Sequence, residues 1–213
     1  KTTLLRCLAT IDLPDQGSTL IDGLDPRHES DRIEIRRRLG YQPQSPGMAP
    51  TSRVFDVLDY LAVLKGHDDD RARRHLVYRA LEDVDLVDRV GDLVGDLSGG
   101  MVQRLGVAQA ILGEPTLLLL DEPFGALDAL TRRAMQSWLQ EVWLAEERRT
   151  VVMVTHDTEE ALLLADEVVV MANDPGRIVD RVEVPFERPR PLELVSDPAF
   201  VAQRAALLEM LGL

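Results

Sequence analysis

The chain has 213 residues, of which 45% are hydrophobic and 29% are charged, and its formal net charge at pH 7 is -13. This length and composition are typical of one globular domain with a buried core, and they exclude a disordered chain. The acidic balance argues against a nucleic-acid partner, because proteins that bind the phosphate backbone concentrate Lys and Arg on their surface.

No segment of the sequence is long and apolar enough to cross a bilayer. The longest uninterrupted apolar runs have about five residues, whereas a membrane-spanning helix needs roughly 18. The first residues lead into a short amphipathic stretch, not into the long apolar region of a signal peptide. We therefore expect a cytoplasmic location. The single cysteine, Cys7, stands among leucines, and we expect it to be a buried structural thiol.

Short apolar runs alternate with helical patterns along the chain, which predicts the α/β class with a mostly parallel sheet. The predicted strands are residues 19–21, 39–41, 117–120, 151–154 and 168–171. The last three are continuous apolar runs, typical of strands that are buried on both faces. We expect these three to form the inner part of the sheet.

The pattern changes between residues 50 and 112, where apolar residues recur at helical spacing. They are Val54, Leu58, Leu61 and Leu64, followed by Leu76, Val77, Ala80, Leu81 and Val84. Pro and Gly residues mark both boundaries of this stretch. The sequence therefore predicts a helical insertion over about residues 50–112, and further helices over 130–147 and 158–165.

The first three residues, Lys1, Thr2 and Thr3, precede a helical pattern of leucines. A phosphate-binding loop ends in Gly-Lys-Ser/Thr and runs directly into a helix. In this interpretation Lys1 contacts the β and γ phosphates and Thr2 holds a magnesium ion. The glycine-rich part, which cradles phosphates with backbone N–H groups, would precede Lys1. A Lys-Thr pair is common, so the match has little weight by itself.

A second phosphate-binding pattern lies at Ser98, Gly99 and Gly100, just before a helix. Ser98 suits the N-cap position of that helix. The glycines leave bare N–H groups at a helix N-terminus, which carries partial positive charge and favours anions. The alternative is an ordinary capped helix after a glycine turn.

Two carboxylates, Asp121 and Glu122, follow the predicted strand 117–120. They therefore lie at the carboxyl end of a buried strand, where open α/β sheets bind ligands. One carboxylate can organise a hydrated magnesium ion while its neighbour polarises an attacking water, as phosphoryl transfer to water requires. An acidic turn without function is the alternative.

The order of four motifs carries a family resemblance. The run L-S-G-G-M-x-Q-R is followed by L-L-L-L-D-E-P, then by G-A-L-D and by V-T-H-D. Over nearly its whole length the sequence resembles the nucleotide-binding domain of ATP-binding cassette (ABC) transporters. The resemblance implies a P-loop NTPase fold, with a RecA-like, mostly parallel sheet and an inserted helical subdomain. It implies that residues 1–213 form one ABC ATPase domain, and that the given sequence starts within its Walker A loop.

The resemblance also implies cofactors and partners. ATP and Mg²⁺ are expected as cofactors, and a second nucleotide-binding subunit as partner in a homodimer. ATP hydrolysis by this dimer would drive transport through transmembrane permease subunits at the cytoplasmic face of the membrane. In an importer, a solute-binding protein would join them.

The resemblance assigns roles to residues in the first half of the chain. Lys1, Thr2 and Thr3 match the end of the Walker A loop. Gln44 matches the loop glutamine that senses magnesium and contacts the membrane partner, with Gln42 as the nearby competitor.

Further roles follow for residues in the second half. The signature Ser98, Gly99 and Gly100 would close over the γ-phosphate bound to the other subunit, and Asp128 would be the D-loop residue linking the two sites. Asp121 would be the Walker B carboxylate, Glu122 the catalytic base and His156 the switch histidine. The remaining histidines lie in charged surroundings and are expected at the surface: His28, His67 and His75.

The two halves of the chain resemble different subfamilies. Residues 40–113 are similar to exporters of the drug and antibiotic type, whereas the part from Phe124 onward is similar to the ATPases of nitrate, sulfonate and taurine importers. The direction of transport therefore stays open at this point. A soluble ABC ATPase of translation or DNA repair is the alternative class. Translation-type members carry two cassettes in one chain, and DNA-repair members insert a long coiled coil between the halves. Only 53 residues separate Gln44 from Ser98, and neither feature appears.

Overall fold

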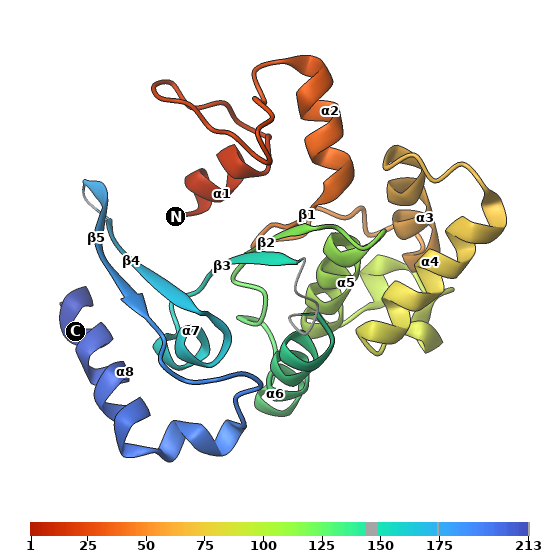
Figure 1. The fold of residues 1–213 in the computed structure, drawn as a ribbon. Helices are drawn as coiled ribbons and strands as arrows, with labels where there is room; N and C mark the ends of the chain where they lie inside the picture. Colours follow the sequence, from red (N-terminus) through yellow and green to blue (C-terminus); the bar gives the residue numbers. More distant parts are fainter. Residues whose placement is uncertain (144–148, 174, 213) are drawn as a thin grey trace.

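The centre of the molecule is a three-stranded parallel sheet in the order β1-β2-β3 (Figure 1). The structure is a computed structural model that describes residues 1–143, 149–173 and 175–212. The strands are β1 (Leu39–Gln42), β2 (Leu117–Asp121) and β3 (Thr150–Val154). Asp121 at the end of β2 pairs with Val154 at the end of β3, so the carboxyl ends of the strands meet at one edge. The predicted α/β class is confirmed.

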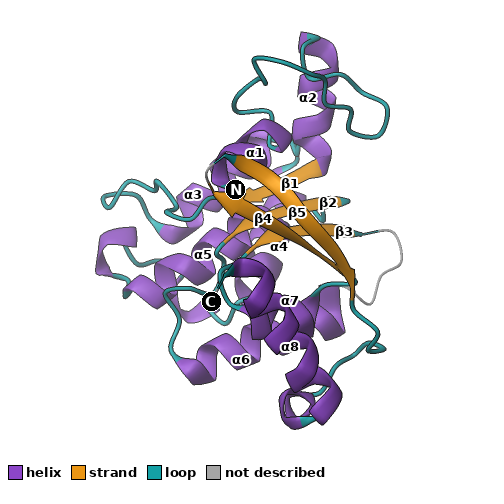
Figure 2. Ribbon diagram, turned by 90° about the vertical axis from the view of Figure 1, so that its left-hand side faces the viewer, coloured by secondary structure: helices purple, strands orange, loops and turns teal. Residues whose placement is uncertain are grey.

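Strand β2 is buried because helices cover both faces of the sheet (Figure 2). Leu119 points to one face, where it packs with Leu5 of α1 (Thr2–Leu8) and Ile35 of α2 (Glu29–Arg38). Leu118 and Leu120 belong to the larger core cluster on the other face. The continuous apolar run of β2 therefore reflects burial on both sides, as the sequence predicts.

Helices α3 (Val54–Leu64), α4 (Asp70–Asp83) and α5 (Gly99–Ile111) pack together on one flank of the sheet (Figure 1). Two short 3₁₀ turns, Val87–Arg89 and Val94–Asp96, join α4 to α5. Most of the apolar residues that predicted these helices are buried or partly buried in their common interface, whereas Leu64 is 61% exposed. The predicted helices are thus confirmed, while the treatment of residues 50–112 as a separate subdomain stays a prediction.

Strands β4 (Glu167–Asn173) and β5 (Gly176–Glu183) form a separate antiparallel pair. The expectation that residues 168–171 belong to the inner sheet is therefore wrong. Val169 is 40% exposed, because this pair has helix α8 near it but is not sandwiched as β2 is. The predicted strand 19–21 is also wrong. Ile21 forms an isolated bridge with Leu24 across a tight turn, in which Asp22 and Gly23 both have positive φ.

The C-terminal half supplies three more helices. Helix α6 (Ala129–Trp138) continues into a π-helical turn (Leu139–Trp143), and residues 144–147 of the predicted helix lie outside the described residues. Helix α7 (Thr158–Leu164) is where the sequence predicts it. A 3₁₀ turn (Leu192–Ser196) leads into α8 (Pro198–Leu211). No helix within the described ranges is long and apolar enough to cross a membrane.

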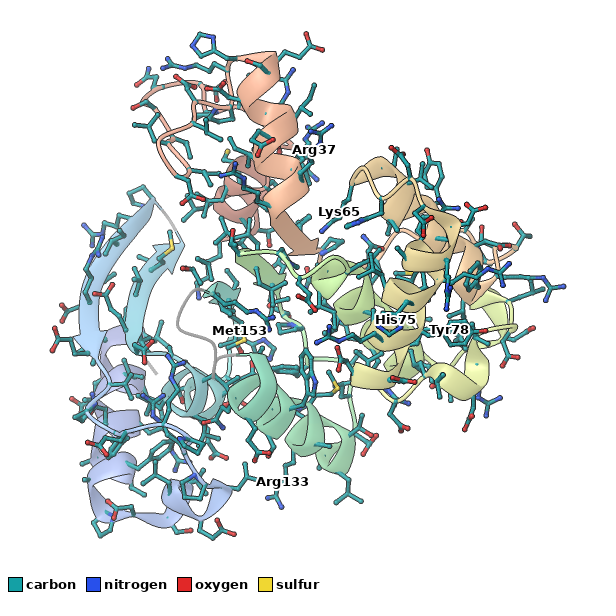
Figure 3. All side chains as sticks on the ribbon, turned by 45° about the vertical axis from the view of Figure 1, so that its right-hand side comes forward. Arg37, Lys65, His75, Tyr78, Arg133 and Met153 are labelled. Carbon is teal, nitrogen blue, oxygen red and sulfur yellow. The ribbon has the colours of Figure 1, made fainter. Side chains whose placement is uncertain are left out.

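Two side chains differ from their predicted burial. Cys7 is half-buried instead of fully buried. His67 is half-buried, unlike His28 and the exposed His75 on α4 (Figure 3). The reason is local: the imidazole of His67 packs against Gly113, where an added Cβ would lie 2.9 Å from its Nε2.

Candidate active site

The predicted site residues gather at the edge where the three parallel strands end. Gln44 follows β1, Asp121 and Glu122 close β2, and His156 follows β3. Lys1, at the start of α1, lines a cleft together with Val154 and Thr155 at the end of β3. The topology alone brings these segments together, since parallel strands present their carboxyl ends at one edge.

Gln44 and His156 both approach the carboxylate of Glu122. Gln44 Nε2 donates a hydrogen bond of 3.2 Å to Glu122 Oε2. His156 Nδ1 lies 3.4 Å from the other oxygen, Oε1. The Glu122 side chain is 29% exposed and that of His156 is 73% exposed. Side chains from the segments that follow β1 and β3 therefore meet the Glu122 carboxylate, which water can reach.

The backbone of Glu122 is held in an unusual conformation. Its φ is +50°, a value that a residue with a side chain rarely adopts. Its N–H donates to the Val154 carbonyl over 2.9 Å, and its carbonyl accepts from Gly125 N over 3.3 Å. The same carbonyl accepts a hydrogen bond of 3.1 Å from Gln103 Nε2. The motifs assign no role to Gln103, although a glutamine within the apolar pattern of α5 is a signal for such a contact.

Asp121 is buried without a polar partner. It is 1% exposed, and neither carboxylate oxygen has a hydrogen bond within the described structure. The pKa of neighbouring Tyr41 is raised, first by burial and then by the charge of Asp121. A buried carboxylate without a partner is costly unless a cation compensates it. Asp121 therefore fits a magnesium ligand.

The side chains of the other predicted metal ligands also suit magnesium. The hydroxyl of Thr2 and the amide of Gln44 are hard oxygen ligands, as Mg²⁺ prefers. Among the residues that the structure describes, no group of three or more His, Cys, Asp or Glu could hold a metal ion. Mg²⁺ commonly takes one or two carboxylates and completes its shell with substrate phosphates and water. The site fits a metal that arrives with a nucleotide.

The second phosphate-binding pattern forms the N-terminus of α5. Ser98 is the N-cap and accepts a hydrogen bond of 3.3 Å from Met101 N, which confirms the predicted cap. Gly99 is exposed, and a Cβ added to it would meet no atom within 4 Å, whereas one added to Gly100 would lie 3.6 Å from Leu127 Cδ2. Within the described part of the chain, no hydrogen bond or ion pair joins residues 98–100 to Glu122. The structure does not bring the two patterns of one chain together.

Asp128 caps helix α6 instead of touching Glu122. Its carboxylate accepts hydrogen bonds of 3.1 Å from the N–H groups of Leu130 and Thr131 and one of 2.7 Å from the Thr131 hydroxyl. These bonds, led by the one from the Thr131 side chain, lower the pKa of Asp128. Asp128 therefore fixes the turn between Glu122 and α6.

A parallel sheet that carries a buried aspartate and a water-accessible glutamate at its carboxyl edge is typical of nucleotide hydrolases. A family model described as ABC transporter matches residues 1–125. The chain belongs to the ABC transporter family, and it is an ATPase subunit.

Known relatives match almost the whole chain. An aliphatic sulfonates import ATP-binding protein of Burkholderia cenocepacia is 38% identical over 209 residues, which cover 98% of this chain and 72% of the relative. A taurine import ATP-binding protein of Chromobacterium violaceum is 40% identical over 213 residues, covering 98% of this chain and 78% of the relative. These matches extend through residues 40–113, the part whose motifs resemble exporters.

Solved structures share the fold. A dimeric post-hydrolysis state of an ATP-binding cassette bound to ADP and Pi superposes with a TM-score of 0.78 and 25% identity. The match covers 87% of this chain and 81% of that one. The structure of the ATP-binding subunit of an ABC transporter has a TM-score of 0.75 over 99% of this chain.

Proposed function

We propose that the chain is the ATPase subunit of an importer for taurine or aliphatic sulfonates, and that it works as a homodimer with Mg²⁺. The observation that carries the catalytic part is the meeting of Gln44 and His156 at the Glu122 carboxylate. The importer assignment is supported by relatives that act on these solutes and match 98% of the chain. Neither of these relatives is a soluble enzyme of translation or DNA repair.

In this proposal Glu122 accepts a proton from the attacking water or polarises it. Its partly exposed carboxylate can reach water, and the two neighbouring side chains fix its orientation. His156 donates a hydrogen bond to the γ-phosphate region, and Gln44 senses the metal. Lys1 and Thr3 hold the nucleotide phosphates. All of these groups belong to segments at the carboxyl edge of the sheet. There they can stabilise the charge that develops on the phosphates during phosphoryl transfer.

Thr2, Gln44 and Asp121 would hold Mg²⁺, which when bound neutralises charge on the β and γ phosphates. The buried Asp121 carboxylate, unpaired within the described structure, supports this set. Asp121 is 1% exposed, so a cation held by it would interact with the carboxylate in a medium of lower dielectric than bulk water.

The signature residues Ser98, Gly99 and Gly100 would bind the nucleotide of the partner subunit. Their separation from Glu122 of the same chain supports such a shared site, as does the dimeric state of the cassette that shares this fold. Asp128, at the turn next to Gly100, would link the two sites. The dimer would dock on permease subunits at the cytoplasmic face of the membrane, with a solute-binding protein delivering the sulfonate.

The test is Glu122→Gln in the full-length protein. Loss of the base should slow ATP hydrolysis by something on the order of 10²- to 10⁴-fold while leaving ATP binding intact. An ATP-bound dimer should then accumulate and be visible by size-exclusion chromatography. Glu209→Gln, on the exposed side of α8, is the matched control and should keep the parental rate. Parental hydrolysis by the Glu122 variant would exclude it as the base.

The solute is tested separately. Cells that express the full-length protein together with permease and solute-binding subunits of a taurine or sulfonate importer should take up labelled taurine or an alkanesulfonate in an ATP-dependent manner. Glu122→Gln should abolish that uptake. Uptake of neither solute would contradict the importer assignment without affecting the role of Glu122.

A further inference from the structure

We infer that Gln103 is a positioning residue for Glu122, and that through it the phosphate-binding start of α5 is coupled to the catalytic carboxylate of the same chain. The inference rests on the proposed role of Glu122 as the base. It adds a residue and a route of communication to that role.

The conformation of Glu122 needs support from its surroundings. A φ of +50° is a strained conformation for a residue with a side chain, and it persists only where neighbouring groups fix it. Strand β3 holds the N–H through the Val154 carbonyl. The side-chain amide of Gln103 donates a hydrogen bond of 3.1 Å to the Glu122 carbonyl. Helix α5 therefore contributes directly to the backbone geometry that aims the carboxylate at Gln44 and His156.

Gln103 is itself fixed in place. It is 5% exposed, and its main-chain carbonyl accepts a hydrogen bond of 3.4 Å from the buried Gln42 Nε2. Gln42 packs against Gly106, where an added Cβ would lie 3.4 Å from its Cγ. The amide of Gln103 thus projects from a tight junction between α5 and β1. It cannot turn away from Glu122 without leaving a buried donor unpaired.

The position of Gln103 along α5 links it to the signature residues. It follows the N-cap Ser98 by five residues, or about 7.5 Å of helix rise. A helix this short and buried moves as one body, so a shift at residues 98–100 carries the Gln103 amide with it. In the proposed dimer those residues bind the partner's nucleotide. Binding of the partner's nucleotide at residues 98–100 then shifts the Glu122 backbone of the same subunit, which acts in that subunit's own nucleotide site.

The test replaces Gln103 with methionine, which keeps the length of the side chain and removes the donor. We expect kcat for ATP hydrolysis to fall on the order of 10- to 100-fold, because small displacements of a catalytic group have effects of this size. The KM for ATP and the melting temperature should change little. Gln109→Met is the matched control, since Gln109 is a half-buried glutamine of the same helix, and it should keep the parental kcat.

A double variant separates a positioning role from a general structural one. In the Glu122→Gln background, Gln103→Met should cause no further loss of the residual hydrolysis, because residues that act as a unit are not additive. Gln103→Glu, which also removes the donor, should lower kcat as Gln103→Met does.

Three results would overturn the inference: parental kcat in Gln103→Met, an equal loss in Gln109→Met, or a further loss in the Glu122→Gln background. Failure of both Gln103 variants to fold would show a structural role and would overturn it too. These results differ from failure of the proposed function, in which Glu122→Gln itself hydrolyses ATP at the parental rate.

Discussion

Gly40 on β1 packs directly against the main chain of Ala110 on α5. A Cβ on Gly40 would lie 1.9 Å from the Ala110 carbonyl oxygen and 2.9 Å from its carbonyl carbon. Both contact atoms belong to the backbone of a buried helix, so neither can rotate away. The absence of a side chain at residue 40 sets the distance between α5 and the sheet, and with it the place of Gln103.

We predict that Gly40→Ala lowers the free energy of unfolding by about 3 kcal/mol or more, because overpacking against buried backbone forces the helix from the sheet. The measurement is urea unfolding followed by circular dichroism. Gly47→Ala is the control: no atom lies within 4 Å of its added Cβ, and its stability should change by less than about 0.5 kcal/mol. Equal stability of the two variants would show that α5 can move away without cost.

The elements that could be predicted from the sequence are those in which burial imposes a recognisable pattern of apolar residues. The run that forms β2 is apolar throughout because helices cover both of its faces. Helix α3 shows its buried stripe because one side meets α4 and α5. In both cases the local pattern and the tertiary environment carry the same information.

Other elements lack such a pattern. Strand β5 is exposed along almost its whole length, so burial imposes no apolar alternation on its sequence. Its structure depends on pairing with β4. Helix α2 buries only Ile35. Helix α8 is different, since Asp197 as N-cap and Pro198 at its first turn are recognisable start signals. The strand expected at 19–21 failed because apolar neighbours of a tight turn imitate a short strand.

The candidate site likewise has a part that could be predicted from the sequence and a part that could not. The meeting of Gln44 and Glu122 could be expected, because strand ends of a parallel sheet share an edge. The hydrogen bond from Gln103 to the Glu122 carbonyl could not, because it depends on the rotation of α5 and its distance from β1. A glutamine within the apolar pattern of α5 indicates a buried polar contact, but it does not identify the partner.

Lys65 joins the helical flank to the sheet. Its Nζ donates hydrogen bonds to the carbonyls of Leu112 and Leu39 over 2.8 and 3.2 Å. It lies at the junction between α3, the end of α5 and the start of β1 (Figure 3). Burial lowers the pKa of Lys65 to about 8 from an ordinary value of 10.5.

We predict that Lys65 makes stability rise with pH in the alkaline range. Between its folded pKa of about 8 and its ordinary value of 10.5, the unfolded chain binds more protons than the folded one, so the free energy of unfolding increases with pH. The penalty for burying the ammonium is fully present below pH 8 and is relieved above it. The gain is at most about 3 kcal/mol, since one pKa unit corresponds to about 1.4 kcal/mol.

The measurement compares the parent with Lys65→Met in urea unfolding between pH 7 and 10. Contributions from other groups largely cancel in this difference. The parent should gain stability relative to the variant as pH rises above 8, while the difference stays flat below that pH. A difference that is constant or falls across the range would mean that Lys65 keeps an ordinary pKa.

In the proposed dimer, the start of α5 and the strand-end edge of the sheet would supply complementary halves of each nucleotide site. Ser98 lies at the exposed start of α5, without a hydrogen bond to Glu122 of its own chain in the described structure. Lys1 lies beside the end of β3, on the same sheet edge as Glu122. If each site combines Lys1 of one subunit with Ser98 of the other, Ser98→Arg should leave the binding of a nucleotide analogue near normal. Hydrolysis should fall by on the order of 100-fold or more, because donors to the γ-phosphate are displaced.

Mixing two inactive variants tests this division directly. A heterodimer of Ser98→Arg and Lys1→Ala subunits has one site with both defects and one with neither. Random pairing should therefore restore up to about a quarter of the parental sites in a symmetric dimer, measured as phosphate release after the subunits exchange. The control mixes Ser98→Arg subunits with subunits that carry both substitutions. No pairing there creates an intact site, so activity should stay at the background of the single variants. Hydrolysis by Ser98→Arg alone at the parental rate, independent of protein concentration, would show instead that each chain works by itself.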